Sequence, residues 1–411
     1  MTASGMVPAQ RRSLVLVGSL AWLAGMIALV VAGHGGFVDL AVYRFGGTAV
    51  LDGLPLYDSG EAGTGLPFTY PPFAALLMTG PALLPFPLAV GLWTSISILA
   101  LAVTITLVLP SRGRSRSSYV VVGLVLAAMA FEPVRANLVF GQVNLLLTAA
   151  VVVDLLGPRR RWSGALIGVV AGIKLTPLVF VVFLVLIGRR HHAAVAGLTF
   201  VATVGLGFAL LPGTSVAYWT DVLWDPGRVG GVPYAGNPSI LAGLTRVGGA
   251  EPSTVAWLLG AGVIASATLV LAAGIWRRGD PALGACVAAV AMLLASPISW
   301  SHHWVWAVPT VIVLMGSGRR WAAGSGTAVF VSGCIWWPPN HDDRELAWSP
   351  IEQVVGNAYL LTALVLVVLL ARPRRGSRLG RSDRPRRVTL VEPRVGSSNV
   401  AVRRRIQSSL E

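Results

Sequence analysis

The side chain with the clearest potential for chemistry is Asp39, a lone carboxylate in the stretch G-F-V-D-L-A-V-Y that begins at Gly36. Apolar residues flank it, and apolar surroundings raise the pKa of a carboxyl group toward neutral values. Such a carboxylate can act as a general base that takes a proton from a sugar hydroxyl. A solvated acid at the start of a helix explains the residue as well, so both interpretations stay open.

Lys174 is the only lysine among 32 basic residues, and it stands in the apolar stretch I-K-L-T-P that begins at Ile173. An ammonium group inside a membrane segment is costly and indicates function. Pro177 ends a helix just after it, which can bring the ammonium group to a polar cavity. There it would pair with the phosphate of an anionic lipid. The alternative is a side chain that extends to the membrane surface.

Two adjacent histidines, His302 and His303, lie in S-P-I-S-W-S-H-H-W-V-W from Ser296. An interfacial aromatic belt explains the tryptophans, but it does not explain the histidines. Phosphate binding or proton transfer does. Neighbouring side chains on a helix point in different directions, so we expect one histidine to face a given site. No Asp, Glu or Cys stands at ligand spacing beside them, and no metal site is predicted.

Further polar and aromatic side chains could hold a sugar or the acceptor, the molecule to which a sugar would be transferred. They come from L-P-F-T-Y-P-P-F at Leu66, from E-P-V-R-A-N-L-V-F-G-Q-V-N at Glu132 and from a long loop with G-R-V-G and G-N-P-S. Glu132 and Arg135 would share one helix face, as an ion pair or as ligands. Arg228 could make a forked contact with phosphate. The candidates for sugar or acceptor binding are Tyr43, Tyr70, Glu132, Arg135, Gln142, Asn144 and Asn237.

The composition decides which kind of scaffold positions these residues. The chain has 411 residues, of which 55% are hydrophobic and 12% charged, whereas soluble chains carry about 25% charged residues. This excludes a soluble protein and a mostly disordered one, and it predicts a polytopic all-α membrane protein. No Gly-rich nucleotide-binding pattern is present, and no cofactor is expected. Both cysteines lie in apolar runs, which predicts neither a disulfide framework nor a metal site.

Apolar stretches of about 17–25 residues are candidates for spanning helices. Two half-segments, 162–173 and 177–188, should meet at a break around Lys174, because basic clusters stand on both sides of the pair. The prolines in 72–87 indicate a segment that dips into the membrane or lies at its surface. The total is about ten to thirteen segments, and the spans are expected near 13–33, 88–110, 118–136, 142–157, 193–211, 253–276, 281–298, 302–318, 321–337 and 350–371.

Short arginine-rich loops mark the cytoplasmic side of a membrane protein. This topology predicts a cytoplasmic N-terminus at 1–12, a transmembrane domain at 13–371 and an Arg-rich, disordered cytoplasmic tail at 372–411. Twelve arginines and three acids in the tail carry +9 of the total charge of +15, which suits anionic lipids better than nucleic acid. The polar motifs then fall on the outer side, in the loops 34–71, 132–143, 212–252, 296–303 and 338–349.

In order and spacing, the motifs over about residues 36–309 resemble glycosyltransferase family 87, the actinobacterial polyprenol-phosphate-mannose-dependent α-1,2-mannosyltransferases. The resemblance implies a GT-C fold with its active site on the outer face of the plasma membrane. It implies a polyprenyl-phosphate-mannose donor, a glycolipid or lipoglycan acceptor and an inverting reaction. It also implies that Asp39 is the general base, with the donor phosphate on Lys174, His302, His303 or Arg228. Pro238 after Asn237 departs from the expected Asn-Gln-Ser type of run and leaves the acceptor open.

Two alternatives remain at this stage. A polyprenyl-phosphate-pentose donor, such as arabinose, would need the same base and the same phosphate contacts. A transporter or lipid flippase would also have a broken helix and an intramembrane lysine. The gathering of polar motifs on one side favours the enzyme, because a transporter places key polar groups near the midplane.

Overall fold

The computed structural model describes residues 8–31, 36–110 and 117–372. Residues Met1–Ala371 form one compact unit, and the predicted tail beyond Arg372 lies outside the described residues. Within the described ranges the regular structure is helical, apart from an isolated bridge between Gly60 and Pro67. The predicted all-α fold class is confirmed.

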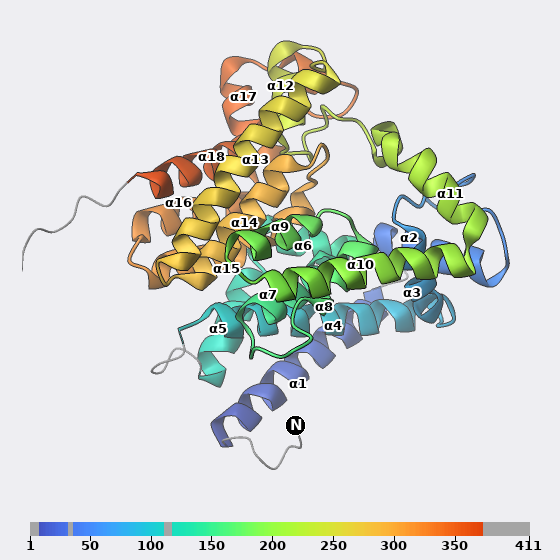
Figure 1. Ribbon diagram of the computed structural model, residues 1–411, viewed down its shortest axis with the longest axis horizontal. Helices are drawn as coiled ribbons and strands as arrows, with labels where there is room; N and C mark the ends of the chain where they lie inside the picture. The colour runs from blue at the N-terminus through green and yellow to red at the C-terminus, as the bar shows by residue number, and fades with distance from the viewer. Residues whose placement is uncertain (1–7, 32–35, 111–116, 373–411) are drawn as a thin grey trace, which may run out of the picture. The chain divides into compact units, whose positions relative to one another are not determined.

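The helices follow one another along the chain, with long connections between α2 and α3 and between α11 and α12 (Figure 1). In the first half of the unit they are α1 (Pro8–Val31), α2 (Val38–Leu51), α3 (Pro72–Ala82), α4 (Phe86–Val108), α5 (Ser118–Ala128), α6 (Glu132–Phe140), α7 (Asn144–Leu156), α8 (Ala165–Ile173), α9 (Leu178–Leu186) and α10 (Arg190–Leu210). In the second half they are α11 (Pro212–Thr220), α12 (Ile240–Gly248), α13 (Thr254–Arg277), α14 (Pro281–Ala295), α15 (Ala307–Gly316), α16 (Arg320–Ser332), α17 (Pro350–Gly356) and α18 (Ala358–Ala371). Short 3-10 helices, labelled η, include η4 (Val222–Trp224), η5 (Pro226–Val229), η6 (Ser301–Trp306), η7 (Cys334–Trp336) and η8 (Arg344–Ala347).

The described residues include three helices that are long and apolar enough to cross a membrane alone, namely α4, α10 and α13. Two bent pairs, α5–α6 at 80° and α17–α18 at 73°, raise the number to five if each pair is one span. Other apolar helices are shorter than a bilayer requires, for example α7 with 13 residues and α14 with 15. The chain is a polytopic membrane protein, and the predicted segments correspond to a mixture of full-length, bent and short helices.

The two bent pairs lie where the sequence predicts the continuous segments 118–136 and 350–371. Between α5 and α6 the bend has a local cause, because Pro133 stands in the first turn of α6 and cannot continue a helix. Between α17 and α18 the helix stops at Gly356, where an added Cβ would lie 2.1 Å from the ring of Trp348. Apolar composition predicts these two segments, but it does not predict the bend within each of them.

The predicted break around Lys174 is confirmed. Helix α8 ends at Ile173, and α9 begins at Leu178. Lys174 itself is extended, with φ −147° and ψ 125°, and Pro177 precedes the first turn of α9. Lys174 therefore lies in the non-helical break between α8 and α9.

Close packing fixes the start of α2, the helix that carries Asp39. Phe37 has the left-handed φ of 57°, and its amide donates to the carbonyl of Val139 over 2.7 Å. Gly141 ends α6 with φ 69°, and a Cβ there would lie 2.7 Å from the Cβ of Leu40. The turn between α6 and α7 therefore lies directly against the first turn of α2.

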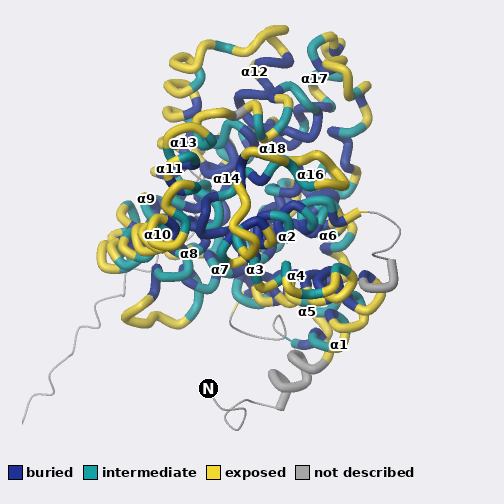
Figure 2. The backbone as a smooth tube through the Cα atoms, turned by 90° about the vertical axis from the view of Figure 1, so that its right-hand side faces the viewer, coloured by how far each residue is buried: buried dark blue, intermediate teal, exposed yellow. Residues whose placement is uncertain are grey.

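Helix α14 runs through the interior of the unit. All positions from Leu283 to Leu294 are buried (Figure 2), and the helix contacts α7, α9, α13, α15 and α18. A helix that is apolar on every side is expected in the centre of a membrane domain. The residues that follow it, including η6, therefore begin from a fixed point in the core of the unit.

The long loop predicted at 212–252 is folded around a buried arginine. Arg246 of α12 is 1% exposed. Its guanidinium donates to the carbonyls of Pro233, Tyr234 and Asn237 and to Oδ1 of Asn357. These bonds tie the loop to the connection between α17 and α18, and α12 and α17 lie at the same end of the unit (Figure 1).

Candidate active site

A cavity of about 300 Å³ lies where α2, the α6–α7 turn, the break after α8 and η6 meet. Its walls come from segments that are far apart in the sequence. The sequence-predicted residues that line it are Asp39, Tyr43, Tyr70, Gln142, Lys174, Arg228, His302 and His303. The predicted base and all predicted phosphate-binding residues thus line the same cavity.

Asp39 lies in the first turn of α2, outside the candidate spans. Burial of its carboxyl group raises the pKa of Asp39 to about 6, whereas a hydrogen bond from Gln142 and the charge of Lys174 act in the opposite direction. The group is therefore mostly ionised at neutral pH, and it is a stronger base than a solvated aspartate. These are the properties that a general base requires.

Gln142 lines the cavity together with Asp39. Its Oε1 accepts hydrogen bonds from the hydroxyl of Tyr43 over 2.8 Å and from Nδ2 of Asn144 over 3.2 Å. With the oxygen occupied, the amide nitrogen of Gln142 is the group left to interact with Asp39, and this interaction lowers the pKa of the carboxyl group. The hydroxyl of Tyr43 also lies 2.9 Å from that of Tyr70, so the base stands beside a connected set of polar groups.

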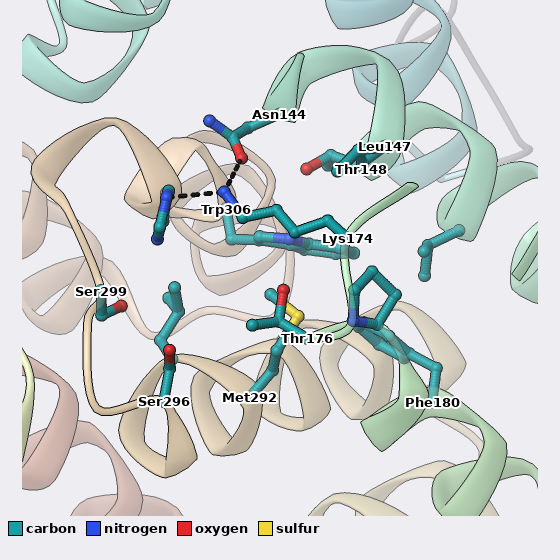
Figure 3. Close-up of a pocket in the computed structure, with 14 residues that line it drawn as sticks. Asn144, Leu147, Thr148, Lys174, Thr176, Phe180, Met292, Ser296, Ser299 and Trp306 are labelled. Carbon is teal, nitrogen blue, oxygen red and sulfur yellow. Dashed lines mark hydrogen bonds between the residues drawn. The ribbon is translucent and has the colours of Figure 1, made fainter. Parts of the chain in front are cut away.

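Lys174 lies between an amide and an imidazole (Figure 3). Its Nζ donates to Oδ1 of Asn144 over 3.1 Å and lies 2.7 Å from Nε2 of His303. An ammonium group only donates, so Nε2 of His303 accepts when the lysine is charged, and the imidazole is then neutral. Nζ also lies 5.6 Å from the centre of the Tyr70 ring. The result is an oriented amine at the wall of the cavity. Burial lowers the pKa of Lys174 to about 7, and the charge of Asp39 opposes that shift.

His302 and Arg228 contribute polar atoms that are not fully used within the described residues. The rings of His302 and His303 lie at right angles with centres 4.9 Å apart, and both line the cavity. Nε2 of His302 is buried with no hydrogen-bond partner in the described part of the chain, and the same is true of Nε of Arg228. Arg228 donates another nitrogen to the carbonyl of Tyr57. These groups could donate to a phosphate.

Glu132 and Arg135 do not line the cavity. Glu132 is buried and accepts hydrogen bonds from Ser301 Oγ at 2.9 Å, Trp336 Nε1 at 3.0 Å and Tyr359 OH at 2.9 Å. Arg135 is exposed and donates to a nearby backbone carbonyl. Among the described residues Glu132 forms no ion pair with Arg135, and it instead connects η6 to η7 and α18.

Asn237 also lies outside the cavity and is 0% exposed. Its Nδ2 donates to the carbonyl of Val232 over 3.1 Å, and its Oδ1 accepts from the amide of Ser299 over 2.8 Å. It fixes the segment that leads into His302 and His303. Asn144 lies one step behind the cavity wall, in a crevice on the other side of Lys174.

Several cavity residues carry no signal that sequence reasoning could use. Tyr218 of α11 lines the cavity and belongs to no charged or repeated pattern. Thr176 also lines it, and although it belongs to the I-K-L-T-P stretch, it is not among the predicted site residues. Asp225 also lines it, and its Oδ1 accepts from the amide of Gly227 over 3.1 Å. The tyrosine pair Tyr57 and Tyr218, with ring centres 5.8 Å apart, could only be found once the fold placed the two loops together.

Within the described ranges, no group of three or more His, Cys, Asp and Glu side chains is arranged to hold a metal ion.

Comparison with known proteins gives consistent matches. Residues 68–297 match glycosyltransferase family 87. The chain is 33% identical over 368 residues, 81% of its length and 83% of the relative's, to the polyprenol-phosphate-mannose-dependent alpha-(1-2)-phosphatidylinositol mannoside mannosyltransferase of Mycolicibacterium smegmatis. It is 31% identical to the Mycobacterium tuberculosis protein of the same name, over 84% of this chain and 87% of that one.

A third relative is the polyprenol-phosphate-mannose-dependent alpha-(1-2)-phosphatidylinositol pentamannoside mannosyltransferase of Mycobacterium tuberculosis. It is 36% identical over 298 residues, 70% of this chain and 68% of the relative. No solved structure gives a significant match. The family match covers more than half of the chain and includes Tyr70, Gln142, Lys174 and Arg228. The chain therefore belongs to glycosyltransferase family 87 and is a glycosyltransferase.

Proposed function

We propose that the protein transfers mannose from polyprenyl-phosphate-mannose to a hydroxyl group of a glycolipid or lipoglycan, forming an α-1,2 linkage with inversion. The observation that carries the proposal is the shared cavity of Asp39 and the Lys174–His303 pair. A base and a fixed cation on one cavity are the two elements that an inverting transfer from a sugar phosphate requires. The donor and linkage in the names of the relatives support the same reaction.

In the proposed mechanism, Asp39 takes the proton from the acceptor hydroxyl as its oxygen attacks the anomeric carbon of mannose. The bond from that carbon to the phosphate oxygen breaks, and the polyprenyl phosphate leaves with the bonding electrons. A single displacement inverts the configuration, so a β-linked donor gives an α-linked product. The raised pKa of Asp39, about 6, suits proton transfer near neutral pH.

The leaving group needs stabilisation of negative charge more than it needs a proton, because a phosphate ester is a stable anion. Lys174 supplies a positive charge that is already oriented by Asn144 and His303. His302 and Arg228 line the same cavity and offer further hydrogen-bond donors to the phosphate oxygens. Preorganised donors of this kind are usually the largest contribution to catalysis.

The two tyrosines beside Asp39 are proposed to contact the sugars. The rings of Tyr43 and Tyr70 lie edge to face with centres 5.2 Å apart, and both line the cavity. Hydroxyl groups and ring faces together match the polar edges and apolar faces of a pyranose. The cavity is proposed to open to the outer side of the plasma membrane, because the arginine-rich loops lie on the other side of this topology.

The test is a transfer assay with purified protein in proteoliposomes. Polyprenyl-phosphate-mannose and polyprenyl-phosphate-arabinose are offered separately with a phosphatidylinositol mannoside acceptor, and products are digested with an α-1,2-mannosidase. We expect a mannosylated product that the enzyme digests and little transfer from the pentose donor. Transfer of arabinose alone, or a mannosylated product that resists digestion, would contradict the proposal. A vesicle assay that detects lipid movement without transfer would favour a flippase.

A further inference from the structure

A second, apolar groove of about 450 Å³ lies between α14, η6, α15, α16 and α18. Valine, leucine, alanine and aromatic side chains form most of its lining, with hydroxyl groups only from Thr310, Ser325 and Thr362 among the described residues. On its outer rim Trp321 and Val365 are 92% and 57% exposed. The groove is therefore open to the hydrocarbon that surrounds a membrane protein.

This groove is connected to the candidate active site by a short series of shared walls. A narrow crevice of about 30 Å³ lies behind the cavity, and Lys174 and His303 line both of them. Leu293 and Trp306 line both that crevice and the apolar groove. The path from the cavity to the membrane-facing groove thus passes the cation and then a wall of two apolar side chains.

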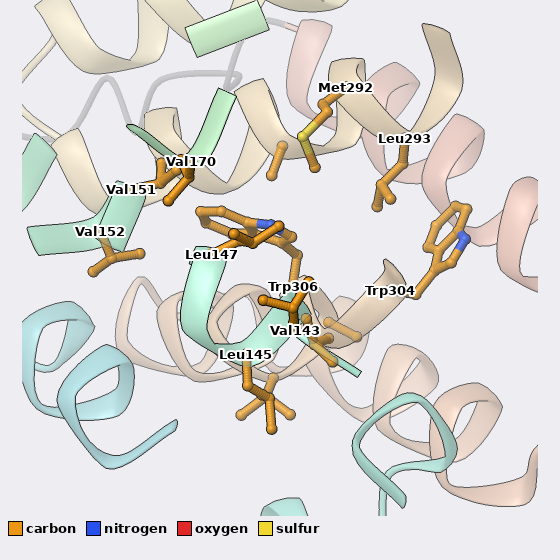
Figure 4. Close-up of a cluster of buried hydrophobic side chains, with 14 of the residues drawn as sticks. Val143, Leu145, Leu147, Val151, Val152, Val170, Met292, Leu293, Trp304 and Trp306 are labelled. Atoms are coloured by element: carbon orange, nitrogen blue, oxygen red, sulfur yellow. The ribbon is translucent and has the colours of Figure 1, made fainter. Parts of the chain in front are cut away.

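The wall is built from side chains that pack without polar bonds across the path. Trp306 is 4% exposed and stacks on Phe180 with ring centres 5.6 Å apart. Figure 4 shows Trp306 in the middle of a cluster with Leu293 and Met292. These contacts are apolar, so a hydrocarbon chain that passes Trp306 would replace them by contacts of the same kind.

We propose that the groove binds the isoprenoid chain of the donor lipid, with its phosphate on Lys174 and the chain passing Trp306 to reach α15, α16 and α18. This rests on the proposed function and adds the site of the lipid tail. In a polyprenyl phosphate the phosphate is joined directly to an apolar branched chain, so a phosphate held at Lys174 requires an apolar exit within a few bonds. The crevice and the groove provide such an exit, because the crevice shares Lys174 with the cavity and Trp306 with the groove.

The matched variants are Gly326→Leu and Gly324→Leu, both in α16. Gly326 lines the groove, and a Cβ there meets only Val311 at an ordinary 3.6 Å. Gly324 is exposed, has open space around its Cβ and does not line the groove. Both changes add the same side chain to the same helix, but only Gly326→Leu narrows the groove.

Each variant is assayed with a long polyprenyl-phosphate-mannose and with a donor of one or two isoprene units. We expect Gly326→Leu to raise KM for the long donor by about tenfold, the size expected when roughly two methylene groups lose their burial. KM for the short donor should stay unchanged, as should both values for Gly324→Leu. Equal effects on the two donors, or no effect, would overturn the inference. Absence of transfer by the unmodified protein with either donor would instead count against the proposed function.

Labelling gives a second measurement that depends neither on turnover nor on the folding of Gly326→Leu. Ser325 is exposed and lines the groove, and Ser332 is exposed on the same helix but away from it. Both native cysteines are buried. Long-chain polyprenyl phosphate should slow maleimide labelling of Ser325→Cys by several-fold and leave Ser332→Cys unaffected. Equal labelling with and without the lipid, or equal protection by a phospholipid at the same concentration, would contradict the groove assignment.

Discussion

Nζ of Lys174 lies 2.7 Å from Nε2 of His303, although 129 residues separate them in the chain. The lysine stands in the break between α8 and α9, and the histidine lies in η6 directly after α14 and its connecting loop. Both face the cavity that contains Asp39. We propose that this pair contacts the phosphate of the donor.

Replacement of Lys174 by glutamine should weaken donor binding. The variant loses the charge that contacts the donor phosphate, and we expect KM for polyprenyl-phosphate-mannose to rise about ten- to a hundredfold. His303→Gln should cause a smaller rise, because it removes only the partner that orients the ammonium group. Steady-state kinetics of both single variants and the double variant measure the effects. Strict additivity of the two changes would show that the pair does not act as a unit.

The pH dependence of transfer should report the ionisation of Asp39. A general base acts when deprotonated, so kcat/KM should rise with pH through the Asp39 pKa of about 6. It should fall again as Lys174, whose pKa burial lowers to about 7, loses its proton. Gln142→Leu removes the hydrogen bond that lowers this pKa, so the midpoint of the profile should move to higher pH. Rate profiles from pH 5 to 8 with saturating donor test this. A midpoint that stays in place in Gln142→Leu would mean that Gln142 does not contact the base.

Glu132 should matter for stability and not for substrate binding. Glu132→Gln replaces one oxygen, which accepts from buried donors, by an NH₂ group that cannot accept. We expect a loss of about 2–4 kcal/mol in the free energy of unfolding, seen as a lower Tm in detergent, with donor KM unchanged. Arg135→Ala is the control, since Arg135 is exposed, and its Tm should match the parent. A rise in KM without loss of stability would instead show that Glu132 contributes to substrate binding.

The proposed orientation predicts which loops a reagent can reach from outside the cell. Ser59 lies in the exposed connection between α2 and α3, on the side of the cavity, and Arg278 lies in a basic turn after α13. A membrane-impermeant maleimide should label Ser59→Cys in intact cells and Arg278→Cys only after the membrane is ruptured. The opposite pattern would place the cavity on the cytoplasmic side.

Much of this site could be predicted from local sequence, because costly residues stand out in an apolar chain. Asp39, Lys174 and the histidine pair were recognisable from their surroundings, and Pro177 marked the break. The partners of Glu132 could not be predicted, because Ser301, Trp336 and Tyr359 lie 169, 204 and 227 residues away. A carboxylate and an arginine on one helix face suggest an ion pair, but tertiary donors satisfy the carboxylate instead.

The lengths and bends of the helices are a second feature that local sequence does not predict. Apolar composition identifies segments that belong in a membrane, and it does so correctly for α4, α10 and α13. Short helices such as α8 and α9, with nine residues each, depend on neighbours to satisfy the ends of their backbones. Those neighbours come from distant parts of the chain, so local sequence identifies the apolar segments but does not predict which of them are short or bent.

The most direct test of the central claim is transfer activity of Asp39→Asn compared with Asp225→Asn. Both residues are carboxylates that line the cavity, and asparagine keeps their shape while removing the base. The account predicts that Asp39→Asn lowers kcat for mannose transfer by about a hundred- to ten-thousandfold, with normal expression and donor binding, while Asp225→Asn stays close to the parent. Transfer by Asp39→Asn at the parent rate would contradict the assignment of Asp39 as the base.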